Sequence, residues 1–556
     1  MTLRHRPHRV LYVPADDRPC SVQWPRLLCR LVDWDLVEPP AQLLGWFTQA
    51  GDPEEIQAWA VEVAREPLDG AVLSLDMLAY GGLYASRAPG TRTALALSRM
   101  EALWRVREAA GDVPIFSFGS IMGLTTLTRS DESARYVDAL REFSRKADAE
   151  MVLGDQGALD ALGADDTGIP DAVLGEYLAI RRRNHEVNRR AIEELARGSL
   201  SYLVLAQDEA ASEGVHLHEQ ARLAELAWEL GVGDRLVVSG GGPEMGMVLI
   251  ARAIHAHMNK TPRVRLVYSS PEGARRTPPG EDRPLSEMVA KTVSLLGGEI
   301  VETGQADVTA LVNCPLSDEA DPALDLPSAE DHLRDVANLL GEGERLAGGR
   351  GVAVLDVAYR EGADDALARG LLSGGQDPAR LLAFSAWDRG SGCLGIGLAH
   401  AAIRVISLQD KGAFDLAQLI ADLTPMRYLG LLDALIESEK AHVTLLFSRL
   451  VEDWLYQSGI RRRVQEHIVR LVRGAIVDMR QVHERAESMM SDLLTGAAAD
   501  LWIEHFLGRP SVDIGMEPHR SSLMLAELEE TRLRLPWRRL AEVEVGIEFG
   551  VELVAE

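Results

Sequence analysis

The stretch Ser201-Tyr-Leu-Val-Leu-Ala-Gln-Asp-Glu209 indicates both a fold class and the position of a functional site. Its apolar run, residues 202–206, has the length of a strand that is buried on both faces. The run ends at Gln207, Asp208 and Glu209, polar residues that a buried strand accommodates only at its carboxyl end. Because the chain turns there, both carboxyl groups can reach one cleft while being buried to different degrees.

Unequal burial separates the pKa values of two neighbouring carboxyl groups. The group with the raised pKa becomes a general acid near neutral pH, and its ionised neighbour can hold or orient a substrate. Asp208 and Glu209 are therefore the predicted catalytic residues. An alternative interpretation is that both only cap the helix that begins near His218.

Eight further apolar runs of strand length alternate with helical patterns along the chain. They cover residues 9–14, 70–76, 113–118, 235–239, 264–268, 308–313, 352–356 and 381–385. This alternation predicts an α/β fold, and the number of strands favours a (β/α)8-like parallel barrel. Nine strands are one more than such a barrel needs, so we expect one of them, which the pattern does not identify, to lie outside it.

The strand pattern disappears in residues 415–507, where apolar residues recur at helical spacing. The last part of the chain alternates between apolar and polar residues, which predicts two or three antiparallel strands. We therefore expect three parts. They are a catalytic barrel over residues 1–410, a helical domain over 411–510 and a small β-rich segment over 511–556.

Composition restricts the partners that this chain can have. The formal net charge of −27, with no basic cluster interleaved with aromatic residues, excludes nucleic acid and makes small neutral or cationic substrates easier to accept. The four cysteines show no C-x-x-C spacing, which fits a reducing cytoplasm. The apolar run at residues 10–13 is too short for a signal peptide, and no segment approaches the ~20 apolar residues of a membrane span. We expect a cytoplasmic protein that binds neither nucleic acid nor a membrane.

Other motifs exclude some reaction classes. The glycine cluster of residues 240–246 has Met245 where the third glycine of a dinucleotide-binding G-x-G-x-x-G would stand. Neither Gly119-Ser120 nor the Gly390-Ser-Gly392 segment has the G-x-S-x-G spacing of a serine hydrolase. His216 and His218 lie close to Asp208 in sequence, so a metal site built from these three residues is an alternative.

Three segments together resemble an uncharacterised bacterial family with a P-L-D-x-R-P-like opening and a D-M-L-x-Y-G-G-L motif. They are Pro14-Ala-Asp-Asp-Arg-Pro19, Asp76-Met-Leu-Ala-Tyr-Gly-Gly-Leu83 and Gln207-Asp208-Glu209. The resemblance covers most of the chain. The segment from Trp387 to Gly392 departs from the family's W-N-T-x-G-N at both asparagines. Because this family has no established activity, the resemblance supports the fold and the location of the site.

The Asp208-Glu209 pair also resembles the carboxyl pair at the end of the fourth strand in barrel N-acetylhexosaminidases that use substrate-assisted catalysis. That resemblance implies that Asp208 orients the N–H of the substrate's 2-acetamido group and that Glu209 protonates the leaving oxygen. It further implies a tyrosine, Tyr268 or Tyr359, that steadies the acetamido oxygen.

We therefore expect a glycoside hydrolase that acts on a small carbohydrate with a terminal N-acetylgalactosamine or N-acetylglucosamine and uses neither a cofactor nor a metal. Trp387 could stack on the sugar, and the other candidates lie at or near strand ends. The predicted substrate-binding residues are Asp16, Asp17, Arg18, Asp76, Tyr80, Arg87, Glu244, Tyr268, Asn313, Asp356, Tyr359, Trp387 and Asp388. Two alternatives remain. One is a metal-dependent hydrolase that uses Asp208, His216 and His218, and the other is a non-enzymatic carbohydrate-binding protein. The helical region could join two copies of the chain.

Overall fold

The computed structural model describes most of the chain. The described residues are 7–124, 136–147, 168–208, 210–317, 329–347, 351–374, 377–412, 425–472, 479–515 and 520–555.

A six-stranded parallel sheet forms the core of the amino-terminal half. In spatial order its strands are β2 (Trp34–Val37), β1 (His8–Val13), β5 (Gly70–Ser74), β6 (Ile115–Ile121), β7 (Tyr202–Gln207) and β8 (Leu236–Gly240). Five of these, β1, β5, β6, β7 and β8, end in buried residues, as expected for parallel strands covered by helices on both faces.

A second parallel sheet, of five strands, follows in the chain. Its order is β10 (Glu299–Ile300), β9 (Arg263–Tyr268), β11 (Val308–Asn313), β12 (Ala353–Asp356) and β13 (Ala383–Ser385). Counted in chain order within each sheet, both sheets begin with the order 2-1-3-4-5. That order is typical of open doubly wound folds, which bind ligands outside the carboxyl ends of their strands.

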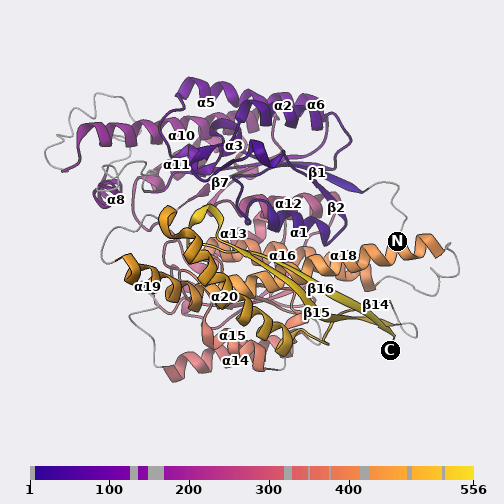
Figure 1. Ribbon diagram of the computed structural model, residues 1–556. Helices are drawn as coiled ribbons and strands as arrows, with labels where there is room; N and C mark the ends of the chain where they lie inside the picture. The colour runs from indigo at the N-terminus through magenta and orange to yellow at the C-terminus, as the bar shows by residue number, and fades with distance from the viewer. Residues whose placement is uncertain are drawn as a thin grey trace.

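Helices fill the space between the two sheets. They are α1 (Gln23–Arg30), α12 (Met245–His257), α13 (Leu285–Leu295) and α16 (Gly390–Gly412). Their apolar side chains form one core cluster with residues of both sheets, such as Val10 of β1 and Val312 of β11. The two halves are therefore joined by a shared hydrophobic layer, and the four helices that contribute to it lie in the middle of Figure 1.

Other helices cover the outer faces. The first sheet carries α2 (Pro53–Val63), α5 (Thr93–Arg99), α6 (Glu101–Ala110), α10 (Asp171–Arg197) and α11 (Val215–Glu229). The second sheet carries α14 (Ala329–Ala347) and α15 (Asp365–Ser373). In Figure 1 these two groups lie at opposite ends of the molecule. Two smaller elements of the amino-terminal half are the hairpin of β3 (Gly45–Trp46) with β4 (Gln49–Ala50) and the helix α8 (Val137–Lys146).

All nine expected strands are present, and each belongs to one of the two parallel sheets, which also contain β2 and β10. Which of the nine would lie outside a barrel therefore stays untested. The single closed (β/α)8-like barrel is not confirmed. Within the described residues the sheets are open, with β2 and β8 at the edges of one and β10 and β13 at the edges of the other. The physical reason is the helix α12, which follows β8 and contacts β5 and β6. It covers the face of the first sheet, and β9 then begins a new one.

The carboxyl-terminal region contains the expected helices and strands. The helices are α18 (Pro425–Arg449), the π-helical turns of η7 (Leu450–Ile460), α19 (Arg461–Val472) and α20 (Met479–His505). The antiparallel strands are β14 (Pro510–Ile514), β15 (Ser521–Arg534) and β16 (Glu544–Ala555). These elements pack against the second sheet, and α18 also contacts α1 of the first half.

One described helix is long and apolar enough to cross a membrane by composition alone, which the sequence analysis did not anticipate. It is the segment Gly390–Lys411 of α16, and 89% of its most apolar window is buried inside the protein. Because α16 packs between the two sheets, its apolar composition is that of a core helix.

The contact between α12 and β1 leaves no room for a side chain at Gly246. A Cβ atom there would lie 2.2 Å from the hydroxyl oxygen of Tyr12, which is buried and donates a hydrogen bond to the carbonyl of Ser21 at 2.8 Å. We predict that Gly246→Ala lowers the free energy of unfolding by about 1–3 kcal/mol through overpacking. Gly175→Ala in α10, where a Cβ atom meets open space, is the matched control and should be neutral or stabilising by about 0.5–1 kcal/mol. Urea unfolding followed by circular dichroism measures both, and an equal effect of the two changes would contradict the packing argument.

Candidate functional site

A cavity of about 260 Å³ lies at the carboxyl ends of the strands and receives residues from three parts of the chain. Asp208 follows β7 and Glu244 follows β8 in the first half, whereas Arg389 follows β13 in the second half. Glu542 reaches the cavity from the segment before β16. The cavity is therefore formed jointly by the two halves and the carboxyl-terminal region.

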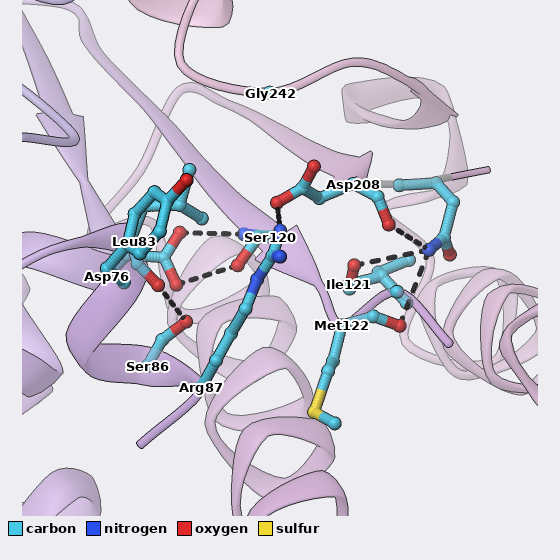
Figure 2. Close-up of polar contacts among 12 residues, drawn as sticks. Asp76, Leu83, Ser86, Arg87, Ser120, Ile121, Met122, Asp208 and Gly242 are labelled. Carbon is cyan, nitrogen blue, oxygen red and sulfur yellow. Dashed lines mark hydrogen bonds and ion pairs between the residues drawn. The ribbon is translucent and has the colours of Figure 1, made fainter. Parts of the chain in front are cut away.

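Asp208 is held by two guanidinium groups. Its Oδ2 atom pairs with Arg87, as Figure 2 shows, and its Oδ1 atom lies 3.2 Å from Nη2 of Arg389. The end of β7 is fixed by Gln207, whose side-chain amide donates to the carbonyls of Ile121 and Asp208 at 3.3 and 2.9 Å. Only 5% of Asp208 is exposed. A buried carboxylate between two arginines, one from each half, is a fixed negative charge in the cavity.

Asp76 positions Arg87. It lies in α3 (Leu75–Tyr80), and its carboxylate accepts hydrogen bonds from the backbone N–H and the hydroxyl of Ser120 at 2.9 and 2.8 Å, and from the hydroxyl of Ser86 (Figure 2). Burial raises the pKa of Asp76 to about 6. Ser86 ends the short helix α4 (Leu83–Ser86), directly before Arg87. Asp76 thus anchors the segment that carries Arg87, without lining the cavity itself.

The two glycines between α3 and α4 make this arrangement possible. Gly81 and Gly82 have φ values of 85° and 128°, in the region that favours glycine. A Cβ atom on Gly81 would lie 2.6 Å from the carbonyl oxygen of Gly51. The paired glycines of the D-M-L-A-Y-G-G-L motif therefore have a structural role, which is to turn the chain between Asp76 and Ser86.

Glu244 is the second buried carboxyl group in the cavity. It lies at the start of α12, where the backbone N–H of Gly242 donates to its Oε1 atom at 2.8 Å. Burial raises the pKa of Glu244 to about 7, although this hydrogen bond opposes the shift. One cavity therefore contains a carboxylate paired with two cations and a carboxyl group that keeps its proton close to neutral pH.

Glu542 is a third buried carboxyl group, and it comes from the carboxyl-terminal region of the chain. Burial raises its pKa to about 7, and the guanidinium of Arg18 lies 4.0 Å away. Arg18 is itself held by Asp16, with 2.8 Å between Nη2 and Oδ2, and its guanidinium lies 4.6 Å from the ring centre of Trp537. The amino-terminal motif and the carboxyl-terminal segment thus meet at this wall of the cavity.

Arginine dominates the charge of the cavity. Its lining contains six arginines and five acidic residues, and two of those acidic residues, Glu244 and Glu542, have a pKa near 7. The arginines are Arg18, Arg87, Arg360, Arg389, Arg461 and Arg539. At neutral pH the lining is therefore more positive than negative, the reverse of the whole chain, whose charge of −27 favoured neutral or cationic substrates.

The structure brings six of the predicted site residues to this cavity. They are Arg18, Arg87, Asp208, Glu244, Trp387 and Asp388. Asp16, Asp17 and Asp76 lie behind the lining as supports; Asp17 accepts a hydrogen bond from the indole of Trp537 at 2.7 Å. Tyr80 is buried beneath the guanidinium of Arg183, so the structure does not place it at the cavity. Glu209, the predicted general acid, lies outside the described residues.

Other predicted residues form a separate polar cluster at the ends of β11 and β12. The side-chain amide of Asn313 donates to Asp356 and Asp364 at 3.0 and 3.2 Å, and His332 lies 2.6 Å from Asp364. Burial, with the neighbouring Asp364 charge, raises the pKa of Asp356 to about 7. The lining of the cavity includes neither this cluster nor Tyr268 and Tyr359. These residues are therefore not brought together with Asp208.

The residues of the metal alternative do not converge either. His216 is buried, and its Nε2 atom lies 2.9 Å from the carbonyl of Ala211, whereas His218 is exposed on α11. Among the described residues, His8, Asp69 and His257 form a group whose possible ligand atoms lie within 4.8 Å of one another. Since His8 begins β1, this group is at the amino ends of the strands, at the edge of the sheet away from the cavity.

Sequence reasoning missed several lining residues. Arg389 had an available signal, because it directly follows Asp388 at a strand exit. Arg461, Arg539 and Glu542 had none, since they lie in the region expected to be outside the catalytic domain. Their placement depends on how the carboxyl-terminal region folds back over the two sheets.

No curated protein matches this chain. One family model, described as "Protein of unknown function (DUF4127)", matches residues 10–546 and thus includes both sheets and the carboxyl-terminal contributors to the cavity. The chain therefore belongs to the DUF4127 family.

Proposed function

We propose that the protein is a glycoside hydrolase in which Glu244 donates a proton and Asp208 is the ionised partner. One observation carries this proposal. A single cavity of about 260 Å³ is lined by a carboxyl group with a pKa near 7 and by a carboxylate paired with two arginines. Cleavage of a glycosidic bond typically uses two carboxyl groups whose surroundings give them different pKa values, so that one is protonated while the other is ionised.

Glu244 has the properties of a general acid. Its Oε1 atom accepts the hydrogen bond from Gly242, which leaves Oε2 to carry the proton. A group with a pKa close to the working pH is half protonated there and transfers its proton readily to a leaving oxygen. The proposal assigns the acid to Glu244, which lines the same cavity as Asp208, whereas Glu209, the acid expected from the sequence, lies outside the described residues.

Asp208 has the properties of an orienting carboxylate. Each of its oxygens already contacts one arginine, and each still has a lone pair that can accept an N–H or O–H of the substrate. In the substrate-assisted form expected from the sequence, that donor is the acetamido N–H of an N-acetylhexosamine. Asp208 keeps the same role in this proposal.

A screen of nitrophenyl glycosides, including the N-acetylglucosaminide and the N-acetylgalactosaminide, tests the class of reaction. Hydrolysis above the level of an Asp208→Asn, Glu244→Gln double variant would support the proposal. Binding of sugars without turnover of any substrate would instead favour the non-enzymatic carbohydrate-binding alternative.

We predict that activity falls as the pH rises above about 7. Glu244 is competent only when protonated, and with a pKa near 7 it loses its proton above that pH. Glu244→Gln should lower kcat/KM by ~10²- to 10⁴-fold on an alkyl glycoside and far less on a nitrophenyl glycoside, whose leaving group needs no proton. The pH profiles of both enzymes on both substrates measure this.

Two further variants serve as controls for that measurement. Glu542→Gln removes the other lining carboxyl group with a pKa near 7 and should retain the decline of kcat/KM above pH 7. Glu209→Gln tests the acid suggested by the sequence. Equal losses on alkyl and nitrophenyl substrates for Glu244→Gln would remove Glu244 from the proton-donor role.

We predict a specific effect of Asp208 on acetamido substrates. If Asp208 orients the acetamido N–H during cyclisation, Asp208→Asn should reduce kcat more for the N-acetylhexosaminide than for the matching 2-hydroxy sugar. A thiazoline analogue of the cyclised intermediate should inhibit the wild-type enzyme strongly. Efficient cleavage of plain hexosides without thiazoline inhibition would argue against the substrate-assisted route and leave a direct two-carboxylate mechanism.

A further inference from the structure

A second and larger cavity, of about 950 Å³, adjoins the candidate active site. Six of its sixteen lining residues are arginines, and only Glu272 and Glu281 are acidic. The arginines are Arg141, Arg145, Arg275, Arg276, Arg360 and Arg389. In a chain with 85 acidic and 58 basic residues, this lining has the opposite balance of charge.

The two acidic residues do little to neutralise this lining. Glu281 is buried, accepts a hydrogen bond from the backbone N–H of Ser391 at 2.8 Å, and has a pKa that burial raises above its usual value. Glu272 is exposed and lies 3.8 Å from Arg276. Carboxylates outside the lining pair with two of the arginines, Arg141 with Asp138 at 2.8 Å and Arg389 with Asp208 at 3.2 Å, so the excess of positive charge comes from the remaining arginines.

The arginines of this cavity differ in the contacts that their side chains make within the protein. Arg276 donates to the carbonyls of Pro315 and Leu316 at 3.1 and 2.6 Å, which fixes its side chain, and its one carboxylate neighbour among the described residues is the exposed Glu272. Arg145, Arg275 and Arg360 are exposed, and none has a carboxylate within 4.0 Å among the described residues. Several guanidinium groups are thus available to a ligand.

The two cavities share two of their lining residues. Arg360 and Arg389 belong to both, and Arg389 also contacts Asp208. A ligand that places one sugar beside Asp208 and Glu244 can extend past these arginines into the larger space. The part of the ligand in the larger cavity then faces arginines on several sides, and the planar guanidinium matches the geometry of carboxylate and other oxyanions.

We propose that the larger cavity is a subsite for the anionic groups of an acidic oligosaccharide, whose cleaved residue lies in the smaller cavity. The saccharide identity rests on the proposed function, whereas the preference for anions rests on the arginines themselves. Uronate carboxylates and sulfate esters share the chemistry that this lining recognises.

Isothermal titration calorimetry with two tetrasaccharides tests the subsite. One consists of galacturonic acid residues and the other of the corresponding neutral galactose residues. The protein is the full chain with Glu244→Gln, so that neither ligand is cleaved. We expect the acidic tetrasaccharide to bind at least about 10-fold more tightly, and this difference to shrink as salt rises from about 0.05 to 0.5 M.

Arginine variants locate the binding. Arg145→Gln and Arg275→Gln remove exposed charges of the cavity and should each weaken binding of the acidic ligand roughly 2- to 5-fold, with about 10-fold for the pair, while leaving the neutral ligand unaffected. Arg92→Gln, an exposed arginine outside both cavities, is the matched control and should change neither affinity. Circular dichroism checks that the folds of the variants are equal.

Equal affinities for the two tetrasaccharides, or unchanged binding of the acidic one by the double arginine variant, would overturn the subsite. Failure of the proposed function has a different signature. In that case no glycoside is hydrolysed by the wild-type enzyme, but the charge-dependent binding and its loss in the arginine variants persist.

Discussion

The buried guanidinium of Arg449 joins the parts of this structure that form the cavity. Its Nη1 atom lies 2.9 Å from Asp453, its Nη2 atom pairs with Glu452, and its Cζ atom lies 3.6 Å from the ring centre of Trp24 in α1. Asp453 accepts from the backbone N–H of Ala386 after β13, and Glu452 accepts from that of Val543 before β16, at 2.8 and 3.1 Å. One charge thus connects the first half, the second half and the carboxyl-terminal segment. Without it, two buried carboxyl groups would lose their counter-ion, a loss that typically costs about 3–5 kcal/mol.

The residues that contact Arg449 also position the residues of the cavity. The ring of Trp24 meets that of Trp387 edge-on, with 5.1 Å between their centres, and Trp387 follows Ala386 directly. Asp388 then adopts φ = 54°, which is unusual for a residue with a side chain and turns the backbone toward Arg389. The π-helical turns of η7 present Glu452 and Asp453 to Arg449 together, and such turns often occur near functional sites. The contact between Arg389 and Asp208 therefore depends on packing that is centred about Arg449.

The sequence indicated the local elements well and their assembly poorly. Each buried strand was predicted from a short apolar run, and Asp208 and Glu244 were found because polar residues follow such runs at strand ends. The division of the eleven strands, nine of them predicted, into two open sheets could not be predicted, because alternating strands and helices produce the same pattern in a barrel and in two doubly wound halves. Glu542 and the contact between Arg389 and Asp208 were missed for a related reason. Arg389 lies 181 residues from Asp208 in the chain, and no periodicity reports a contact over that distance.

Net charge was the least informative property of the sequence for this site. A formal charge of −27 describes the average surface, and at physiological salt the field of exposed charges decays over about 8 Å. A ligand inside the cavities is affected most by the nearest charged groups, and most of the charged lining residues are arginines. Arg389 belongs to both cavities and also pairs with Asp208, so one guanidinium connects the charged groups of the larger cavity with those of the smaller one.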